Sequence, residues 1–155
     1  MLNGHCDAAF MASAISLSYR GRGRTEANPN VGCIIVKDGM VIGRGWTQPG
    51  GRPHAEAMAL KQAGKKAVGA DIYVTLEPCT HQSPRGPACC EMVIAARPAR
   101  VIVASLDPDM RTHRKGIDQI GQAGISVSVG LMEIEARRAM AAFFSRSERA
   151  RPQII

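Results

Sequence analysis

The alternation of short β-branched runs with helix-like segments is the feature that most constrains how this chain folds. Asp38 and Gly39 form a strong hairpin-turn dipeptide, so residues 31–45 are predicted to form a β-hairpin. Strands that alternate with helices build a sheet covered by helices on both faces, and the opening hairpin makes that sheet mixed rather than purely parallel. Asp7 is a candidate N-cap of the first helix. The other predicted strands are 71–76, 100–105 and 125–129, and the predicted helices are 7–19, 54–64, 89–97, 115–123 and 131–147.

Length, apolar content and cysteine usage are those of one intracellular domain. The 155 residues contain no internal repeat and no low-complexity linker, so we expect a single domain over residues 1–155. No apolar run approaches the roughly 18 residues of a membrane span, and the run at 8–17 lacks a basic leader. The five cysteines, an odd number without a secretory signal, favour a cytoplasmic location, where clustered cysteines more often bind metal than form disulfides.

The formal net charge of +7 is compatible with a nucleic-acid partner, an anionic small substrate or simple solubility. Aromatic residues make up only 4% of the chain, too few for base-stacking platforms, and no nucleic-acid-binding motif is present. A nucleic-acid partner is therefore disfavoured. Much of the positive charge lies in three clusters: Arg20, Arg22 and Arg24; Arg111, Arg114 and Lys115; Arg146, Arg149 and Arg151.

Two motifs carry side chains that can hold a metal ion. His54 opens a predicted helix, Cys79 follows a predicted strand, and Cys89 opens a further predicted helix. One imidazole and two thiolates are suitable zinc ligands, and they leave the fourth tetrahedral position open for water, as in catalytic rather than structural sites. Zinc bound in this way can lower the pKa of that water to about 7. The residues therefore predict a catalytic zinc site.

Glu56 is the candidate general acid-base of this site. It is too close in sequence to His54 to share its helical face, so its carboxylate can point past the metal and carry a proton to a leaving amine. The pattern H-x-E followed by P-C-x-x-C is the signature of zinc deaminases, although here nine residues separate Cys79 and Cys89. The alternatives are buried apolar thiols beside an ordinary histidine, or a structural zinc with Cys90 as fourth ligand; we interpret Cys90 as a small core residue.

Four segments accompany these residues: Arg22–Thr25, Asn28–Gly32, His54–Glu56, and Tyr73–Cys79 with His81. Together they resemble the deaminase of riboflavin biosynthesis, which is the N-terminal half of a bifunctional deaminase/reductase. The resemblance covers about residues 7–152. The stretch YVTLEPC with a widely spaced second cysteine distinguishes this family from deaminases that carry the tight C-x-x-C.

The resemblance implies a three-layer α/β/α, cytidine deaminase-like fold with a five-stranded mixed sheet. It implies hydrolytic deamination of a diaminopyrimidinone that carries a phosphoribosylamino group, with Zn²⁺ as the cofactor and a homodimeric assembly. Carried over by position, Glu56 is catalytic, and His54, Cys79 and Cys89 bind the metal. Substrate contacts are implied at Asn28, His81, Arg85, Asp107 and Asp109, with Arg85 near the substrate phosphate.

Departures from the family keep other functions open. The loop between the cysteine ligands has one residue more than usual, Asp109 replaces a common Asn, Thr47 stands where many relatives have His, and residues 111–115 are more basic. A deaminase of another nucleobase, nucleotide or pterin-like compound is one alternative. A basic nucleic-acid-binding domain with a structural zinc is an alternative of a different class. Because no reductase sequence follows, we expect a monofunctional enzyme with a separate reductase partner, or a piece of a bifunctional one.

Overall fold

The computed structural model describes residues 4–84 and 86–150, and the described chain forms one five-stranded sheet. The strands are β1 (Gly32–Lys37), β2 (Met40–Trp46), β3 (Asp71–Leu76), β4 (Arg100–Ser105) and β5 (Ser126–Val129). Their order across the sheet is β2-β1-β3-β4-β5. The β1–β2 and β1–β3 pairs are antiparallel, whereas the β3–β4 and β4–β5 pairs are parallel, so the predicted mixed sheet is confirmed.

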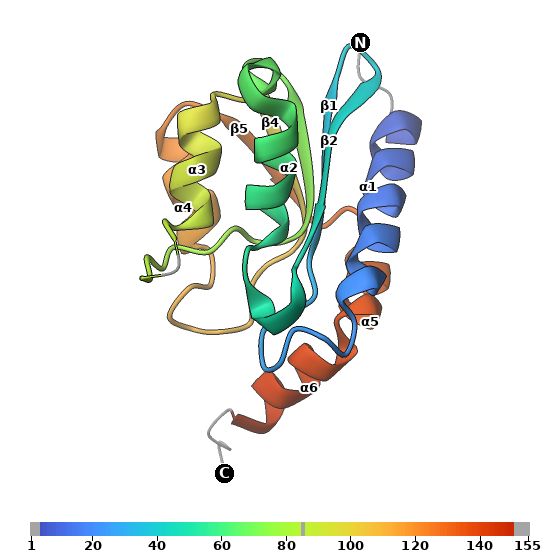
Figure 1. The fold of residues 1–155 in the computed structure, drawn as a ribbon, viewed down its shortest axis with the longest axis vertical. Coiled ribbons are helices and arrows are strands. Elements are labelled where there is room, and N and C mark those ends of the chain that lie inside the picture. The colour runs from blue at the N-terminus through green and yellow to red at the C-terminus, as the bar shows by residue number, and fades with distance from the viewer. Residues whose placement is uncertain (1–3, 85, 151–155) are drawn as a thin grey trace.

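Helices cover both faces of the sheet, and the result is a three-layer α/β/α arrangement (Figure 1). The α-helices are α1 (Gly4–Ser18), α2 (Ala55–Ala63), α3 (Cys89–Ala96), α4 (Lys115–Gln122), α5 (Glu133–Ala139) and α6 (Ala141–Ala150). Helices α2, α3 and α4 lie on one face, α1 and α5 lie on the other, and α6 extends beyond α5 toward the C-terminus (Figure 1). Among the helices of the described ranges, none combines the length and the apolar character needed to cross a membrane.

The two central parallel strands, β3 and β4, begin and end at the residues that the sequence predicts. Each is buried at every position but its first. A strand buried on both faces appears in the sequence as a continuous apolar run, and such a run has well-defined ends. These two strands form the middle of the hydrophobic core, in which Val74, Val101 and Val103 have no exposed surface.

The prediction of one helix over residues 131–147 is wrong, because the segment is divided into α5 and α6 at Met140. Met140 has φ −105° and ψ 29°, which lies outside the helical region. The side-chain amide of Asn30 donates a hydrogen bond of 3.0 Å to the carbonyl of Ala139, at the end of α5. That carbonyl is satisfied from a distant part of the chain, and the bend turns Met140 and Phe144 into the core.

An ion-pair network fixes α1 to the sheet at the end where β3 and β4 begin. Arg100 donates to both carboxylate oxygens of Asp7, at 3.1 and 2.9 Å, and to Asp71 at 2.8 Å. The hydroxyl of Tyr73 donates to Asp7 at 2.6 Å. The prediction of Asp7 as an N-cap is therefore wrong: α1 begins at Gly4, and the Asp7 carboxylate is used in this tertiary network instead.

The opposite end of the sheet is where functional side chains gather. Because β3 and β4 are parallel, their carboxyl ends lie at the same edge, the usual position of ligand sites in open α/β sheets. The N-terminus of α2 reaches this edge by packing closely on β2. It can do so because Gly45 has no side chain, and a Cβ there would overlap the carbonyl oxygen of Ala55.

Candidate metal centre and active site

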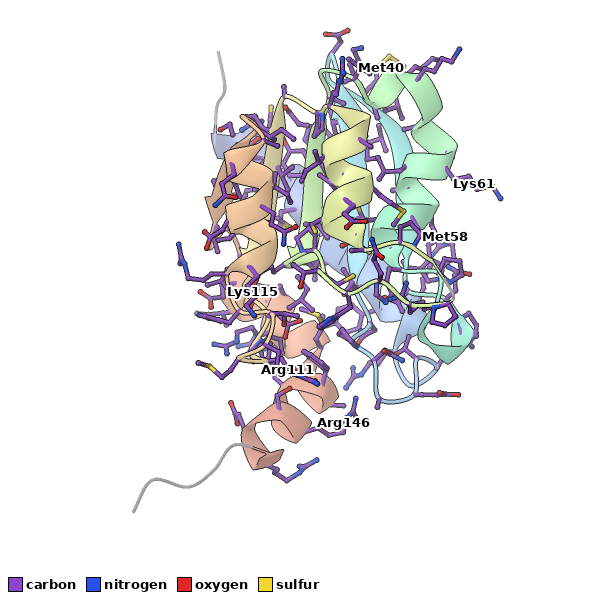
Figure 2. All side chains as sticks on the ribbon, turned by 90° about the vertical axis from the view of Figure 1, so that its left-hand side faces the viewer. Met40, Met58, Lys61, Arg111, Lys115 and Arg146 are labelled. Atoms are coloured by element: carbon purple, nitrogen blue, oxygen red, sulfur yellow. The ribbon has the colours of Figure 1, made fainter. Side chains whose placement is uncertain are left out.

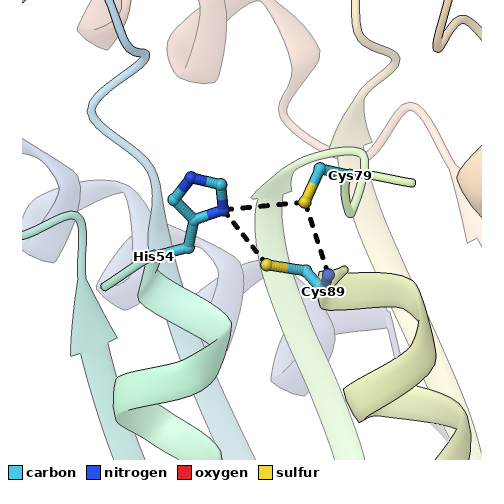
Figure 3. Close-up of side chains that lie close together, drawn as sticks. All are labelled: His54, Cys79 and Cys89. Carbon is cyan, nitrogen blue, oxygen red and sulfur yellow. Dashed lines mark hydrogen bonds between the residues drawn. The ribbon is translucent and has the colours of Figure 1, made fainter. Parts of the chain in front are cut away.

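His54, Cys79 and Cys89 converge into one cluster of metal-ligating atoms (Figure 3). The Nδ1 atom of His54 lies 3.1 Å from the Sγ atom of Cys89 and 3.7 Å from that of Cys79. All three candidate ligand atoms lie within 4.8 Å of one another. In the part of the chain that the structure describes, they form the only group of three or more side chains with metal-ligand geometry.

Three separate elements place these ligands. His54 is the N-cap residue of α2, Cys89 is the first residue of α3, and Cys79 lies three residues beyond the end of β3. Helix N-termini carry partial positive charge, which favours the thiolate form of a cysteine. The backbone N–H of Cys89 also donates to the sulfur of Cys79 at 3.3 Å. Cys90 is fully buried, and its thiol donates to Gln119 at 3.1 Å, so it is directed into the core as expected.

The two cysteine side chains shift each other's pKa in opposite directions. The hydrogen bond from Cys89 is the largest cause that lowers the pKa of Cys79, to about 3, against the opposing effect of burial. The same hydrogen bond and burial raise the pKa of Cys89. A divalent cation that displaced the proton of the Cys89 thiol would gain a second thiolate ligand. One imidazole nitrogen and two sulfurs form the donor set that zinc prefers, and three donors leave a tetrahedral position open. The residues therefore fit a catalytic zinc ion.

Glu56 lies beside this cluster but outside the ligand set. Its residue is 4% exposed, and burial raises the pKa of its carboxyl to about 7, partly offset by the charge of His54. A carboxyl with a pKa in this range can both accept and release a proton near neutral pH, as a general acid-base must. The position in the first turn of α2 turns Glu56 inward, next to the imidazole that precedes the helix.

A cavity of about 230 Å³ opens beside the metal ligands and Glu56. Four of the five predicted substrate contacts line it, namely Asn28, His81, Asp107 and Asp109. The fifth, Arg85, lies outside the described residues, as does Arg151. Thr47 also lines the cavity, and its hydroxyl accepts the backbone N–H of Val31 at 2.9 Å.

The predicted substrate contacts differ in the hydrogen bonds and ion pairs that they already make within the protein. The side-chain amide of Asn28 donates to the carbonyl of Thr25 at 3.2 Å, which holds Asn28 at the cavity wall. Asp107 accepts the backbone N–H of Asp109 at 2.9 Å, and burial raises the pKa of its carboxyl. The Asp109 carboxylate pairs with the guanidinium of Arg111 at 2.7 Å, and this pairing lowers the pKa of Asp109 to about 2. Asp109 is thus already bound to a cation.

Several cavity residues were missed by the sequence reasoning. Arg52 is the most informative, since it makes no hydrogen bond or ion pair with any other residue of the described ranges. Its position two residues before His54 could have drawn attention to it. Phe143 and Ser147 reach the cavity from α6, and no local sequence signal indicates this because the approach depends on the bend at Met140. The missed lining residues are Arg52, Thr112, Phe143 and Ser147, whereas Glu77 and Arg111, which lie in a recognised motif and in a basic cluster of the sequence, also line the cavity.

A sheet of this topology, with a buried carboxyl next to an imidazole-dithiolate cluster, defines the class of zinc-dependent deaminases. Residues 5–105 match the family described as "Cytidine and deoxycytidylate deaminase zinc-binding region", which is about two thirds of the chain, and the chain belongs to this family.

Within the family, the chain is similar to proteins of riboflavin biosynthesis, which confirms the resemblance found in the sequence. The chain is 49% identical over 148 residues to the "Riboflavin biosynthesis protein RibD" of Escherichia coli (strain K12), covering 96% of this chain and 40% of that protein. It is 42% identical over 146 residues to the "Diaminohydroxyphosphoribosylamino-pyrimidine deaminase" of Buchnera aphidicola subsp. Schizaphis graminum, covering 94% of this chain and 99% of that protein.

The fold agrees with these sequence matches. The solved structure of Acinetobacter baumannii RibD, form 1, superimposes with a TM-score of 0.90 at 42% identity, covering 96% of this chain and 41% of that one. The cytidine deaminase-like fold is therefore confirmed. The chain spans about 40% of the length of the RibD relatives, whereas it spans nearly all of the Buchnera deaminase.

Proposed function

We propose that this protein hydrolytically deaminates a diaminopyrimidinone that carries a phosphoribosylamino group, a step of riboflavin biosynthesis. The observation that carries the proposal is the placement of the buried Glu56 carboxyl beside the His54–Cys79–Cys89 cluster, at the wall of a cavity open to solvent. The named activity of the Buchnera relative, of which this chain covers 99%, supports the same substrate.

The overall reaction exchanges an amino group for an oxygen. Water adds to the ring carbon that bears the amino group, the carbon–nitrogen bond breaks, and ammonia leaves. Zinc, when bound by His54, Cys79 and Cys89, supplies Lewis-acid activation of the attacking water at neutral pH. Glu56 accepts one proton from that water and delivers it to the ring nitrogen, and it then takes the second proton from the added hydroxyl and delivers it to the departing amine. The net proton count is unchanged, so Glu56 is ready for the next cycle.

The phosphate end of the substrate requires a cation, and Arg52 is suited to this role. A lining arginine without an acidic partner can form charge-assisted, bidentate hydrogen bonds to a phosphate. Arg111 is already paired with Asp109, so its charge is largely compensated. Asn28, His81 and Asp107 remain the proposed contacts to the ribose and ring, and the role of Arg85 near the phosphate stays a prediction.

Substitution of Glu56 by alanine tests the proposal. In Glu56→Ala, ammonia release should fall by about two to four orders of magnitude, because general acid-base catalysis contributes on this scale, while zinc content stays at one ion per chain. Glu135→Ala is the matched control, since Glu135 is exposed on α5 and lies away from the cavity. A Glu56→Ala enzyme with full activity would remove the assigned role.

A second candidate, deamination of a different phosphorylated pyrimidine, is favoured by one observation. Asp109, where the family resemblance implies Asn, is bound to Arg111, and this ion pair changes the chemistry of one cavity wall. A panel of diaminopyrimidine phosphates and nucleotides, scored for ammonia release, separates the two candidates. A homodimer, a separate reductase and a cytoplasmic location remain predictions. Salt-sensitive binding to RNA or DNA without ammonia release would instead favour the nucleic-acid alternative.

A further inference from the structure

Glu77 is a buried carboxylate that takes no part in the chemistry described above. It follows β3 directly, precedes Cys79 by two residues, and is 3% exposed. Its carboxylate accepts three backbone N–H groups. Oε1 accepts those of Asp107 at 3.1 Å and Arg114 at 3.0 Å, and Oε2 accepts that of Ile117 at 3.2 Å. A buried carboxylate with three amide donors is fully satisfied and rigidly held.

All three donors belong to one segment, residues 106–117, which consists of the loop after β4 and the start of α4. We call this segment the recognition loop. It contributes Asp107, Asp109, Arg111 and Thr112 to the cavity wall. Arg111 projects from it at the same end of the molecule as Arg146, away from Met40 at the start of β2 (Figure 2). The other side-chain bonds of Asp107, Asp109 and Thr112 are made within the loop. They fix the loop's shape but not its distance from the metal ligands.

A second close contact joins the same two segments. A Cβ on Gly116, in the first turn of α4, would overlap the carbonyl oxygen of Pro78. Glu77 and Pro78, which lead into the metal ligand Cys79, therefore touch the recognition loop through a carboxylate on one side and through close backbone packing on the other. Only a glycine at position 116 permits this approach.

We infer that Glu77 is a positioning residue that sets the distance between the metal centre and the recognition loop, and thereby controls substrate binding more than proton transfer. This inference rests on the proposed function, because the loop is taken to contact the substrate. A purely structural role would lower stability and the active fraction without changing KM. A positioning role changes KM in enzyme that is folded and zinc-loaded.

The test compares Glu77→Gln with the wild type. A glutamine can keep its oxygen toward Asp107 and Arg114, but its NH₂ group then faces the N–H of Ile117, and two donors cannot pair. We expect KM for the phosphoribosylated diaminopyrimidine to rise about tenfold, kcat to change by less than about threefold, and zinc content to stay at one ion per chain.

Gly116→Ala displaces the same contact from the other side and should raise KM in the same direction. It decides the matter if Glu77→Gln fails to fold. Asp118→Asn is the matched control, because it removes one negative charge from α4 at an exposed position outside the cavity. An unchanged KM in folded Glu77→Gln, or in folded Gly116→Ala where the first variant is lost, overturns the inference. Loss of zinc from folded Glu77→Gln also overturns it.

Amide hydrogen exchange provides a readout that does not depend on the substrate. The amides of Asp107, Arg114 and Ile117 are protected by the Glu77 carboxylate, so peptides over 106–117 should exchange faster in Glu77→Gln than in the wild type. In Asp118→Asn, the exchange of the same peptides should be unchanged. Equal exchange in the variant and wild type would contradict the inference. A wild type that releases no ammonia from this substrate contradicts the proposed function alone, because the exchange measurement still tests the tie between Glu77 and the loop.

Discussion

Residues 5–105 and residues 106–150 contribute to the same cavity in different ways. The first region, which the family description matches, supplies every proposed metal ligand together with Glu56. The second supplies Asp107, Asp109, Arg111, Thr112, Phe143 and Ser147 to the walls. The chemistry is carried by short motifs that a whole deaminase family can share. The shape and charge of the pocket depend on long-range packing, which can change while the chemistry stays the same.

The largest effect is expected when a metal ligand is removed from the first region, residues 5–105. Cys89→Ala should lose zinc, and ammonia release should fall by at least about three orders of magnitude because activation of water is lost. Metal analysis and an ammonia assay on the purified protein check both parts. Cys90→Ala is the matched control. The thiol of Cys90 donates to Gln119 in the core and does not face the metal ligands, so zinc and most activity should remain. Loss of zinc from Cys90→Ala alone would show that the ligands are misassigned.

Arg52 is an exception to this division of roles, since it lies in the first region yet is proposed to bind the substrate phosphate. In Arg52→Ala, kcat/KM for the phosphorylated substrate should fall about 10- to 100-fold, because a charge-assisted pair to phosphate is lost. The value for the dephosphorylated analogue should hardly change. Arg44→Ala, an exposed site on β2 outside the catalytic cavity, should leave both values unchanged. An equal fall for both substrates would assign Arg52 to the chemistry rather than to the phosphate.

The smallest expected effect lies in the scaffold, at the opposite end of the sheet from the site. Asp7→Asn should lower the free energy of unfolding by about 1–2 kcal/mol at pH 7, because the hydrogen bonds between Asp7 and Arg100 lose their charge. The specific activity of the folded protein should be unchanged. Urea unfolding followed by circular dichroism, with an activity assay on the same samples, measures both quantities.

The difference in the free energy of unfolding between the wild type and Asp7→Asn should depend on pH with a defined sign. The hydrogen bond from Arg100 is the largest cause that holds the pKa of Asp7 below its usual value in the folded protein. The stabilisation is therefore present above the unfolded-state pKa of about 4 and is lost as the pH falls through the folded-state pKa. The gap between wild type and Asp7→Asn should shrink below about pH 4. A gap that stays constant down to acid pH would contradict this assignment.

The sequence predicts elements well where local pattern and tertiary environment agree. The strands 71–76 and 100–105 are continuous apolar runs in the middle of the sheet, and their bounds match the structure. The break between α5 and α6 could not be foreseen, because the Asn30 side chain that bonds Ala139 lies 109 residues away in the chain. The N-cap prediction at Asp7 failed for the same reason, since Arg100 is 93 residues distant.

The residues of the candidate site also divide into those that local sequence identifies and those that only tertiary packing places there. His54, Cys79 and Cys89 could be grouped from the sequence because each residue type binds zinc and each stands at the end of a predicted element. Phe143 and Ser147 could not, because their approach to the cavity depends on the orientation of α6. Glu77 belongs to a motif that was recognised, but its role depends on three backbone donors in a distant loop.

The most direct test of the central claim is a crystal structure of the zinc-loaded protein with anomalous diffraction measured at the zinc absorption edge. We expect a single strong peak bonded to the Nδ1 of His54 and the sulfurs of Cys79 and Cys89, with the Glu56 carboxylate off the ion and a water in the remaining position. A peak elsewhere, or a fourth protein side chain bonded to the metal, would contradict a catalytic zinc centre.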